Sequence, residues 1–387
     1  MLNKKEMHIV QLTPFFSPNV GGVETHLDDL VSELSKRKIE TTVLTYSPLT
    51  SSIKSLSYEK LNKFTTIHRF KWPGFGVFNF LEKYPFLDFL YLTPYLLIRS
   101  YKYILELKNS NKKYLIHAHG LNAALIGVFY RVFFGSKLVV STHAVYELTS
   151  KSKYVGFFIR KILNRSSSIL CLSQASINEI CRLGVEKELI SRFKYWVNTD
   201  YFRPLSSDNE RSDDESFTIL FVGRLIEKKG INLFINAAKL LPRFNFRIVG
   251  GGPLANAVLR ESENIQNLVY YGEKNNNELR AFYNEADIFC IPSLYEEGFG
   301  RVIMEALSCG LPVLGSNKGG IPEALSKEVG VLFEPTTNNL IEELKKIESD
   351  RLRLKSMKRK CRKFALENYS SKNIEIILDK YKQHENF

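Results

Sequence analysis

Two glutamates, Glu297 and Glu305, lie eight positions apart in a glycine-rich segment of the chain. Gly298 and Gly300 permit a tight turn between them, and the apolar residues that follow predict a short helix. The free N–H groups and the positive dipole end at the start of such a helix favour an anion. Each glutamate offers two acceptor oxygens to sugar hydroxyls. The spacing therefore suits a ligand with a diphosphate between two sugars, which describes a nucleotide-sugar. The alternative is a surface helix with two solvated carboxylates.

A basic motif, Gly-Arg-Leu-Ile-Glu-Lys-Lys-Gly, spans residues 223–230 and directly follows a predicted strand. The guanidinium of Arg224 offers a planar fork to phosphate oxygens, and Lys229 adds a point charge. Both would neutralise a leaving diphosphate. Taken alone, the motif fits a basic surface loop equally well.

Glycines also follow other predicted strands. Residues 250–252 end one strand and Gly272 ends the next, whereas Gly21 and Gly22 join a strand to a helix near the start of the chain. A backbone without Cβ atoms can approach a ligand closely, and amides at a helix start can face it. Each cluster alone also fits an ordinary turn, and none matches a P-loop or a GxGxxG motif.

Two histidines, His117 and His119, share one face of a predicted strand because side chains alternate along a strand. Such a pair raises the possibility of a metal site. No third or fourth ligand accompanies it with suitable spacing, so we expect no metal there. His143 follows the next predicted strand, where a structural histidine is at least as good an interpretation as a functional one.

Short apolar runs alternate with amphipathic ones along the chain, which predicts parallel sheets with right-handed crossovers. The expected strands of the first half are residues 7–12, 40–45, 65–69, 114–118, 137–141 and 169–173. Those of the second half are residues 217–222, 246–249, 268–271, 288–291, 313–316 and 330–333. Helices are expected at 24–36, 338–369 and 371–384, with a polar linker at 204–216. A chain of 387 residues is too long for one core, so we expect two domains.

From about Ile9 to Glu334 these motifs resemble those of the retaining GT-B glycosyltransferases, in particular family 4 (glycosyl transferases group 1). The resemblance implies an α/β protein with two doubly wound, Rossmann-like domains that face each other across a cleft. Residues 1–203 would form the acceptor-side domain and residues 217–370 the nucleotide-sugar-binding domain. A C-terminal helix at 371–387 would cross back onto the first domain.

The resemblance also implies a role for each matched residue. The implied catalytic residues are His119, Arg224, Lys229 and Glu297. The implied donor-binding residues are Gly21, Gly22, Gly250, Gly272, Gly298, Phe299, Gly300 and Glu305. His119 would contact the transferred sugar, Glu297 would position it, and Glu305 would hold the ribose, while His117 would belong to the core. The implied reaction moves a hexose-type sugar from a nucleotide-diphosphate-sugar to an acceptor hydroxyl with retention, without a metal and without a further cofactor.

One segment departs from the family pattern. Where relatives carry an Asn-Gly-Val-Asp-like element, this chain has Trp196 in place of the glycine and Asn198 in place of the aspartate. We therefore transfer no acceptor-side role to this segment.

Composition narrows the class of protein and its location. The net charge of +13 allows phosphates, anionic membranes or nucleic acid as partners, but no nucleic-acid-binding motif accompanies it, so we expect no nucleic acid. The five cysteines are scattered without a CxxC pair, which is typical of a reducing cytosol. No signal peptide and no apolar run of about 18 residues occurs, so a cytoplasmic protein without a transmembrane helix is expected.

Two segments predict docking at the inner face of the cell membrane and an acceptor that is a lipid or a lipid-linked or cell-envelope glycan. Residues 151–165 carry five basic and no acidic residues with apolar residues at helical spacing. Residues 75–103 are rich in aromatics and leucine, with Lys83, Arg99 and Lys102 nearby. Basic amphipathic helices can lie among lipid headgroups, but these helices could instead pack only on their own sheet.

Other functions remain open at this stage. A nucleotide-sugar epimerase or a phosphorylase would use the same architecture, and an epimerase would need no acceptor. A non-catalytic sugar-binding protein is a different class, against which the joint presence of Arg224, Lys229, Glu297 and Glu305 argues.

Overall fold

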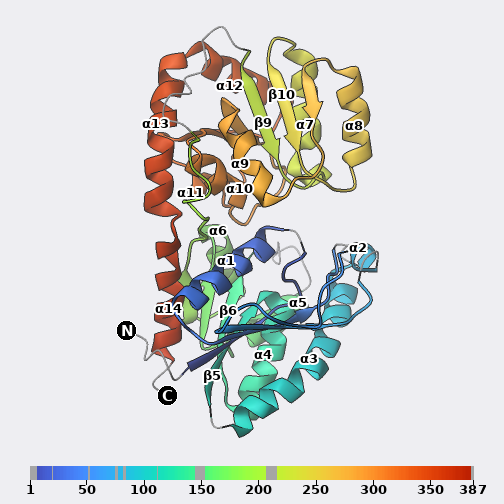
Figure 1. Cartoon of the computed structure of the whole chain (residues 1–387), viewed down its shortest axis with the longest axis vertical. Coiled ribbons are helices and arrows are strands. Elements are labelled where there is room, and N and C mark those ends of the chain that lie inside the picture. Colours follow the sequence, from blue (N-terminus) through green and yellow to red (C-terminus); the bar gives the residue numbers. More distant parts are fainter. Residues whose placement is uncertain are drawn as a thin grey trace. The chain divides into compact units, whose positions relative to one another are not determined.

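The computed structural model describes residues 7–19, 21–50, 53–74, 77–81, 84–110, 112–143, 153–205 and 216–384. The chain forms two compact units, each with a central sheet (Figure 1). The first unit comprises Met1–Phe193 and Asn373–Phe387, and the second comprises Lys194–Lys372. Residues 194–203, expected in the first domain, therefore belong to the second unit, and most of the expected linker lies outside the described residues.

Within its described residues, the first unit holds an eight-stranded sheet in the order β3-β4-β2-β1-β5-β6-β7-β8. Its strands are parallel except β3, which pairs antiparallel with β4. The strands are β1 Met7–Leu12, β2 Thr41–Tyr46, β3 Tyr58–Lys60, β4 Thr65–Phe70, β5 Lys113–His119, β6 Lys137–Thr142, β7 Ser168–Cys171 and β8 Ile190–Arg192. The order reverses between β1 and β5, which is the switch point at which open α/β sheets bind ligands.

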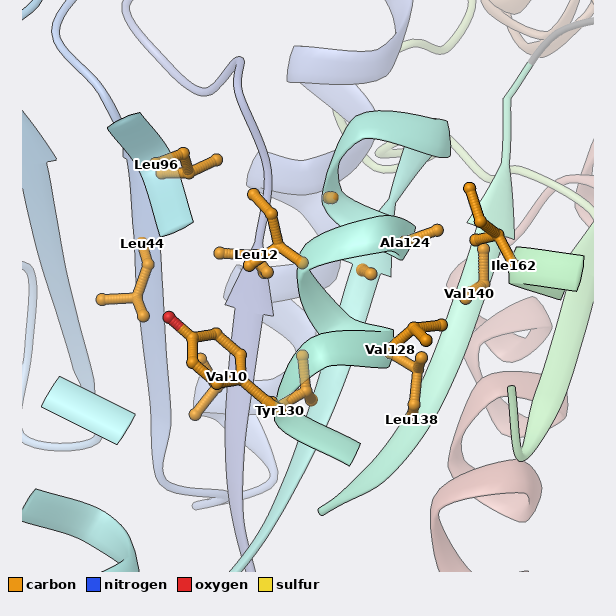
Figure 2. Packing of buried hydrophobic residues seen from close by; sticks show 14 of the residues in the cluster. Val10, Leu12, Leu44, Leu96, Ala124, Val128, Tyr130, Leu138, Val140 and Ile162 are labelled. Atoms are coloured by element: carbon orange, nitrogen blue, oxygen red, sulfur yellow. The ribbon is translucent and has the colours of Figure 1, made fainter. Parts of the chain in front are cut away.

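Helices cover the two faces of this sheet. They are α1 Gly22–Lys36, α2 Val77–Leu81, α3 Pro85–Asn109, α4 Gly120–Phe134, α5 Lys153–Leu163, α6 Gln174–Arg182 and α14 Ile374–Gln383. On one face, Val10, Leu12 and Val140 pack with apolar residues of α3, α4 and α5 (Figure 2). The alternate residues of β1 and β5 point to the opposite face, where Tyr381 of α14 reaches them.

The second unit holds a six-stranded parallel sheet in the order β11-β10-β9-β12-β13-β14. Its strands are β9 Thr218–Val222, β10 Asn245–Val249, β11 Leu268–Tyr270, β12 Ile288–Ile291, β13 Val313–Ser316 and β14 Gly330–Phe333. Its helices are α7 Ile231–Leu240, α8 Ala255–Asn264, α9 Asn276–Asn284, α10 Arg301–Ser308, α11 Ile321–Ala324, α12 Thr337–Ser349 and α13 Arg351–Asn368. The switch point here lies between β9 and β12, so the loops after these strands share one edge of the sheet.

The structure corrects the sequence-based expectation at one helix. Residues 338–369, expected as one helix, form α12 and α13. Asp350 separates them, because its carboxylate accepts the backbone N–H of Arg353 at 2.9 Å and caps the start of α13.

Candidate active site

A buried ion pair joins the two motifs of the second unit. Nζ of Lys229 lies 2.5 Å from Oε1 of Glu297, whose residue is 4% exposed. The same carboxylate accepts the hydroxyl of Ser293 at 2.7 Å and that of Tyr295 at 2.9 Å. The ammonium also lies 5.3 Å from the centre of the Tyr295 ring. Both carboxylate oxygens of Glu297 therefore have partners within the protein, and Glu297 holds Lys229 in place.

Backbone contacts explain why these two side chains meet. Gly230 adopts a left-handed conformation, and a Cβ there would lie 1.9 Å from the carbonyl oxygen of Pro292. The N–H of Leu294 also donates to the carbonyl of Lys228 at 2.8 Å. The loop after β9 is thus tied to the loop after β12, because only glycine permits so close an approach.

The Glu297 loop is supported from its other side by Gly319 and Gly320. The N–H of Gly320 donates to the carbonyl of Glu297 at 2.7 Å, and a Cβ on Gly320 would lie 2.2 Å from the carbonyl oxygen of Gly298. The N–H of Gly319 donates to the carboxylate of Glu296 at 2.6 Å. The Gly319–Gly320 pair therefore supports the turn backbone.

Lys229 and Arg224, the two cations expected to bind the diphosphate, differ in their burial. Burial alone would lower the pKa of Lys229, but attraction to Glu297 and its hydrogen bond outweigh that effect and raise it. Lys229 therefore stays protonated in its half-buried position. Arg224 is exposed at the same loop.

Glu305 lies deeper than expected for a residue that holds a ligand. It is 3% exposed, accepts the hydroxyl of Tyr283 at 2.9 Å, and pairs with Nε of Arg301 at 3.2 Å. The guanidinium of Arg301 also donates to the carbonyl of Trp196 at 3.0 Å. Glu305 thus belongs to a buried polar network that links α9, α10 and the segment after Phe193.

This network gives the divergent segment a structural role. Trp196 is buried and supplies its carbonyl to Arg301, whereas the side-chain oxygen of Asn198 accepts the N–H groups of Asp200 and Tyr201, each at 3.1 Å. Both residues act within the second unit.

The glycine turns after β9, β10 and β11 are joined by backbone hydrogen bonds. The N–H of Gly223 donates to Val249, and the N–H of Gly250 donates to Gly272 at 2.9 Å. A Cβ on Gly250 would lie 1.9 Å from the carbonyl oxygen of Gly223, whereas a Cβ on Gly272 would meet nothing within 4 Å. Gly250 is therefore required for packing, and the space beside Gly272 is open to a ligand.

Gly298, Phe299 and Gly300 lead into α10. Gly300 adopts a left-handed conformation as the residue before the helix, and no side chain caps the helix start. Phe299 is buried, and its ring packs edge-on against Tyr369 at a centroid distance of 5.9 Å. Its side chain thus anchors the turn, and only its backbone can serve a ligand.

In the first unit, His119 and His117 belong to one buried hydrogen-bonded chain. Nε2 of His119 lies 2.7 Å from the side-chain oxygen of Gln11, and its Nδ1 lies 3.0 Å from Nε2 of His143. The amide nitrogen of Gln11 donates to the hydroxyl of Tyr381 at 3.2 Å. That hydroxyl lies 2.6 Å from Nδ1 of His117.

The direction of donation follows from the assigned orientation of Gln11. Because the Gln11 oxygen only accepts, His119 carries its proton on Nε2, and Nδ1 must accept from Nε2–H of His143. The Tyr381 hydroxyl then donates to His117, which donates in turn to Ser141 at 2.7 Å. All three imidazoles are neutral in this arrangement.

Burial agrees with that assignment. It lowers the pKa of His117 and of His143 to about 3, and it lowers the pKa of His119 well below its ordinary value, helped by the neighbouring histidines. His119 is 3% exposed with both ring nitrogens engaged, whereas His143 is half-buried. His143 is therefore the member of the chain that reaches the surface.

Gly21 and Gly22 lie at the start of α1, which has no side-chain cap. A Cβ on Gly22 would meet no atom within 4 Å, so the backbone there is open.

No group of three or more His, Cys, Asp or Glu residues in the described ranges is placed to hold a metal ion. Among those same residues, no helix combines the length and hydropathy needed to cross a membrane.

Several supporting residues escaped the sequence analysis. Ser293 and Tyr295 lie within the Glu297 motif, where hydroxyls at short spacing were a usable signal. Gln11, Tyr283 and Tyr381 act across long sequence separations, which no local pattern reveals.

Comparison with known families covers nearly the whole chain. Residues 20–201 match the model for Glycosyltransferase Family 4, and residues 202–365 match the model for Glycosyl transferases group 1. The chain belongs to the group 1 glycosyltransferases.

Relatives of this glycosyltransferase occur in distant organisms. A human phosphatidylinositol N-acetylglucosaminyltransferase subunit is 28% identical over 353 residues, which cover 88% of this chain and 68% of the relative. An uncharacterized glycosyltransferase of Methanocaldococcus jannaschii is 26% identical, over 89% of this chain and 90% of its own.

Solved structures share the GT-B fold. Anabaena HepE in complex with UDP superposes with a TM-score of 0.74 at 19% identity, over 97% of this chain and all of its own. Sucrose-phosphate synthase from Thermosynechococcus elongatus gives a TM-score of 0.77 at 18% identity, over 97% of this chain and 98% of its own. The glycosyltransferase thus has the two-domain architecture that its sequence predicts.

Proposed function

We propose that this glycosyltransferase moves a hexose-type sugar, with retention of configuration, from a nucleotide-diphosphate-sugar to an acceptor hydroxyl on a lipid or a lipid-linked glycan. The proposal places the donor on the second unit and needs no metal ion. The reaction takes place at an anionic membrane surface, to which the first unit docks.

The ion pair between Lys229 and Glu297 carries the donor side of the proposal. The pair keeps a protonated ammonium at the edge of the sheet where the loops after β9 and β12 meet, with Arg224 exposed beside it. Two cations beside an uncapped helix start suit a diphosphate. Anabaena HepE, whose fold this chain shares, has been solved with UDP-glucose.

The same residues supply the chemistry of the leaving group. As the bond between the sugar and the diphosphate breaks, negative charge grows on the diphosphate, and Lys229 and Arg224 stabilise it. The acceptor oxygen attacks the same face of the sugar, and its proton passes to the departing diphosphate oxygen as the new bond forms. Because two fixed cations neutralise the leaving group, a bound metal is not needed for that task.

Glu297 has a positioning role in this scheme. Its carboxylate is held by Ser293 and Tyr295 as well as by Lys229, so it fixes the ammonium without mobility of its own. A donor whose sugar hydroxyls replace the Ser293 and Tyr295 hydroxyls would bind Glu297 directly.

The acceptor side rests on the surface of the first unit. On α5, Tyr154 is 87% exposed, and Phe157 and Phe158 are about half exposed, while Ile159 and Ile162 pack inward. Phe86, at the start of α3, is 72% exposed, and Phe89 contacts Phe158 at a ring distance of 6.4 Å. The helices thus pack on their sheet with one side and present aromatics with the other.

Basic residues accompany these aromatics. Arg160 and Lys161 lie within 5.3 Å and 4.6 Å of the centre of the Phe157 ring, so their charges sit beside exposed apolar surface. Lys83 and Lys151, which also motivated the membrane prediction, lie outside the described residues. Apolar surface flanked by cations suits the headgroup layer of an anionic membrane, with about 1 kcal/mol per basic residue. The human relative is named for phosphatidylinositol, an anionic lipid.

Three measurements test the parts of the proposal separately. A thermal-shift panel of UDP, GDP, ADP and their sugars should show one stabilising nucleotide, since a ligand at 100 Kd adds about 2.7 kcal/mol. Nucleotide release should then require both that donor and a lipid acceptor. Flotation should show salt-sensitive binding to anionic vesicles and not to neutral ones. A donor consumed without any acceptor would favour an epimerase, and a lack of binding to anionic vesicles would favour a water-soluble acceptor.

A further inference from the structure

The outer side of the helix layer formed by α3 and α4 contains an apolar groove. The two helices lie side by side in the first unit (Figure 1), and a hollow of about 320 Å³ opens between them. Its volume is at the lower end of the range for small-molecule sites. Its accessible surface is apolar, and it is lined by Thr93 and Leu97 of α3 and by Leu125, Phe129, Val132 and Phe133 of α4, among others.

α4 is apolar over most of its circumference. Arg131 is its only charged residue. Its inner side packs closely on the sheet, since a Cβ on Gly127 would lie 2.4 Å from the side chain of Leu138. A helix with one face in solvent normally carries polar residues there. α4 instead exposes two apolar side chains beside the groove, Val132 by 60% and Phe133 by 63%.

The walls of the groove favour a hydrocarbon chain over a protein segment. Protein interfaces carry about one hydrogen bond per 100–200 Å² and place Arg, Tyr or Trp at their centre. This groove offers no polar surface to such a partner.

The groove also continues the surface that we propose for membrane docking. Ile98, the residue after Leu97 on α3, is 67% exposed, and α4 contacts α5 as well as α3. At the far end, Nζ of Lys108 lies 4.7 Å from the centre of the Phe134 ring. This cation keeps its stem on apolar surface and its charge outside the groove.

The groove begins near the polar residues of the first unit. Leu125 lies six residues after His119 along α4, and the lining extends to Phe133. Eight helical residues span about 12 Å. We propose that this groove holds one hydrocarbon chain of the lipid acceptor, with the headgroup toward the Leu125 end; this inference rests on the proposed function.

Photolabelling of the full chain tests the inference. The protein is bound to vesicles of phosphatidylcholine and phosphatidylglycerol with a trace of phosphatidylglycerol that carries a diazirine on one acyl chain. After irradiation, mass spectrometry locates the labelled residues. We expect adducts on α3 and α4 between Leu97 and Phe133. Adducts confined to α2, the start of α3 and α5 would contradict lipid binding in the groove but would agree with membrane docking.

A variant in which larger side chains fill the groove provides a second test. Leu97→Trp combined with Leu125→Trp should reduce labelling of α4 at least tenfold and should slow nucleotide release with the lipid acceptor, while vesicle flotation and stabilisation by the free nucleotide are retained. The matched control is Ile98→Trp, which adds the same ring to α3 outside the groove and should leave the labelling unchanged. Equal labelling of the filled variant would contradict the inference.

Two further outcomes would also contradict the inference: a different occupant of the groove, or the absence of membrane binding. A lipid-free dimer in sedimentation analysis that the Leu125→Trp change abolishes would assign the groove to a second copy of the chain. If the protein floats with no vesicle, both membrane docking and lipid binding in the groove are contradicted. Nucleotide release measures donor turnover independently of that result.

Discussion

The hydroxyl of Tyr381 lies 2.6 Å from Nδ1 of His117, across a sequence separation of 264 residues. The same hydroxyl accepts the amide of Gln11, which in turn holds His119. A residue of α14 therefore fixes the tautomers of two buried histidines on β5. The helix contributes to the polar edge of the first unit as well as to its packing.

Tyr381→Phe should destabilise the first unit and disturb His119. Loss of the hydroxyl leaves His117 and Gln11 without that partner in a buried site, at about 1–3 kcal/mol for each group. Urea unfolding measures the cost, and nitrogen chemical shifts of the imidazoles report the tautomers. Tyr369→Phe, which removes a hydroxyl bonded to Ala324 in the second unit, is the control and should leave the His119 signals in place. Unaltered His119 signals in Tyr381→Phe would contradict the tautomer assignment.

Lys229→Ala should lower kcat by on the order of 10² or more, because a cation that stabilises the leaving group is lost. Arg224→Ala should behave similarly. Lys228→Ala removes an exposed neighbouring charge and should turn over normally. The measurement is steady-state nucleotide release with a matched thermal melt. Normal turnover by Lys229→Ala would mean that the diphosphate is held elsewhere.

Glu305→Ala should weaken nucleotide binding and also destabilise the second unit. The substitution leaves the Arg301 guanidinium buried without that carboxylate, a loss of about 3–5 kcal/mol. The double change Arg301→Leu and Glu305→Leu removes both charges and should recover much of that stability. Calorimetric titration of the double variant with the free nucleotide then separates the two roles. Wild-type affinity in this variant would exclude a ribose contact by Glu305.

Acid should destabilise the first unit through its histidines. The pKa of His117 and of His143 is about 3 in the folded chain, against about 6.5 in an unfolded one. Between these values the unfolded chain binds protons that the folded chain does not, so stability falls as pH falls below about 6.5. The slope approaches about 1.4 kcal/mol per pH unit for each histidine.

Urea unfolding at pH 7.5, 6.0 and 5.0 measures this dependence. His143→Gln replaces the half-buried histidine with a group that does not titrate. The variant should therefore lose the contribution of one histidine to the pH dependence of the unfolding free energy. A wild-type stability that does not change between pH 7.5 and 5.0 would show that the imidazoles are protonated in the folded state.

Activity should survive EDTA, because the proposed mechanism neutralises the leaving diphosphate with Lys229 and Arg224. Nucleotide release is compared before and after treatment, and then with added magnesium. A loss that magnesium restores would rule out the metal-free mechanism.

Strands that are buried on both faces carry the clearest signal in the sequence. β12, for example, is buried at every position, and its sequence Ile-Phe-Cys-Ile is a continuous apolar run. β3 and β8, each three residues long and partly exposed, carry no such pattern, so the sequence analysis missed both.

The sequence likewise predicted some features of the candidate site and not others. Lys229 and Glu297 were found because their motifs are local and their loops follow neighbouring strands of one sheet. That they bond to each other depends on the approach of Gly230 to Pro292, which is a tertiary contact. The burial of Glu305 and His119 likewise depends on Tyr283, Arg301, Gln11 and Tyr381, whose positions no spacing in the sequence indicates.

The return of the chain to the first unit at Asn373 imposes an order on biosynthesis. The ribosome completes β1 to β8 early, yet Gln11 and His117 acquire their tyrosine partner only after α14 emerges. At 5–20 residues per second, translation of residues 194–372 alone takes roughly 10–40 s. During that interval the nascent first unit lacks the contacts of Ile374, Ile377 and Tyr381, all buried in the folded chain, so we expect it to expose apolar surface to chaperones until α14 is made.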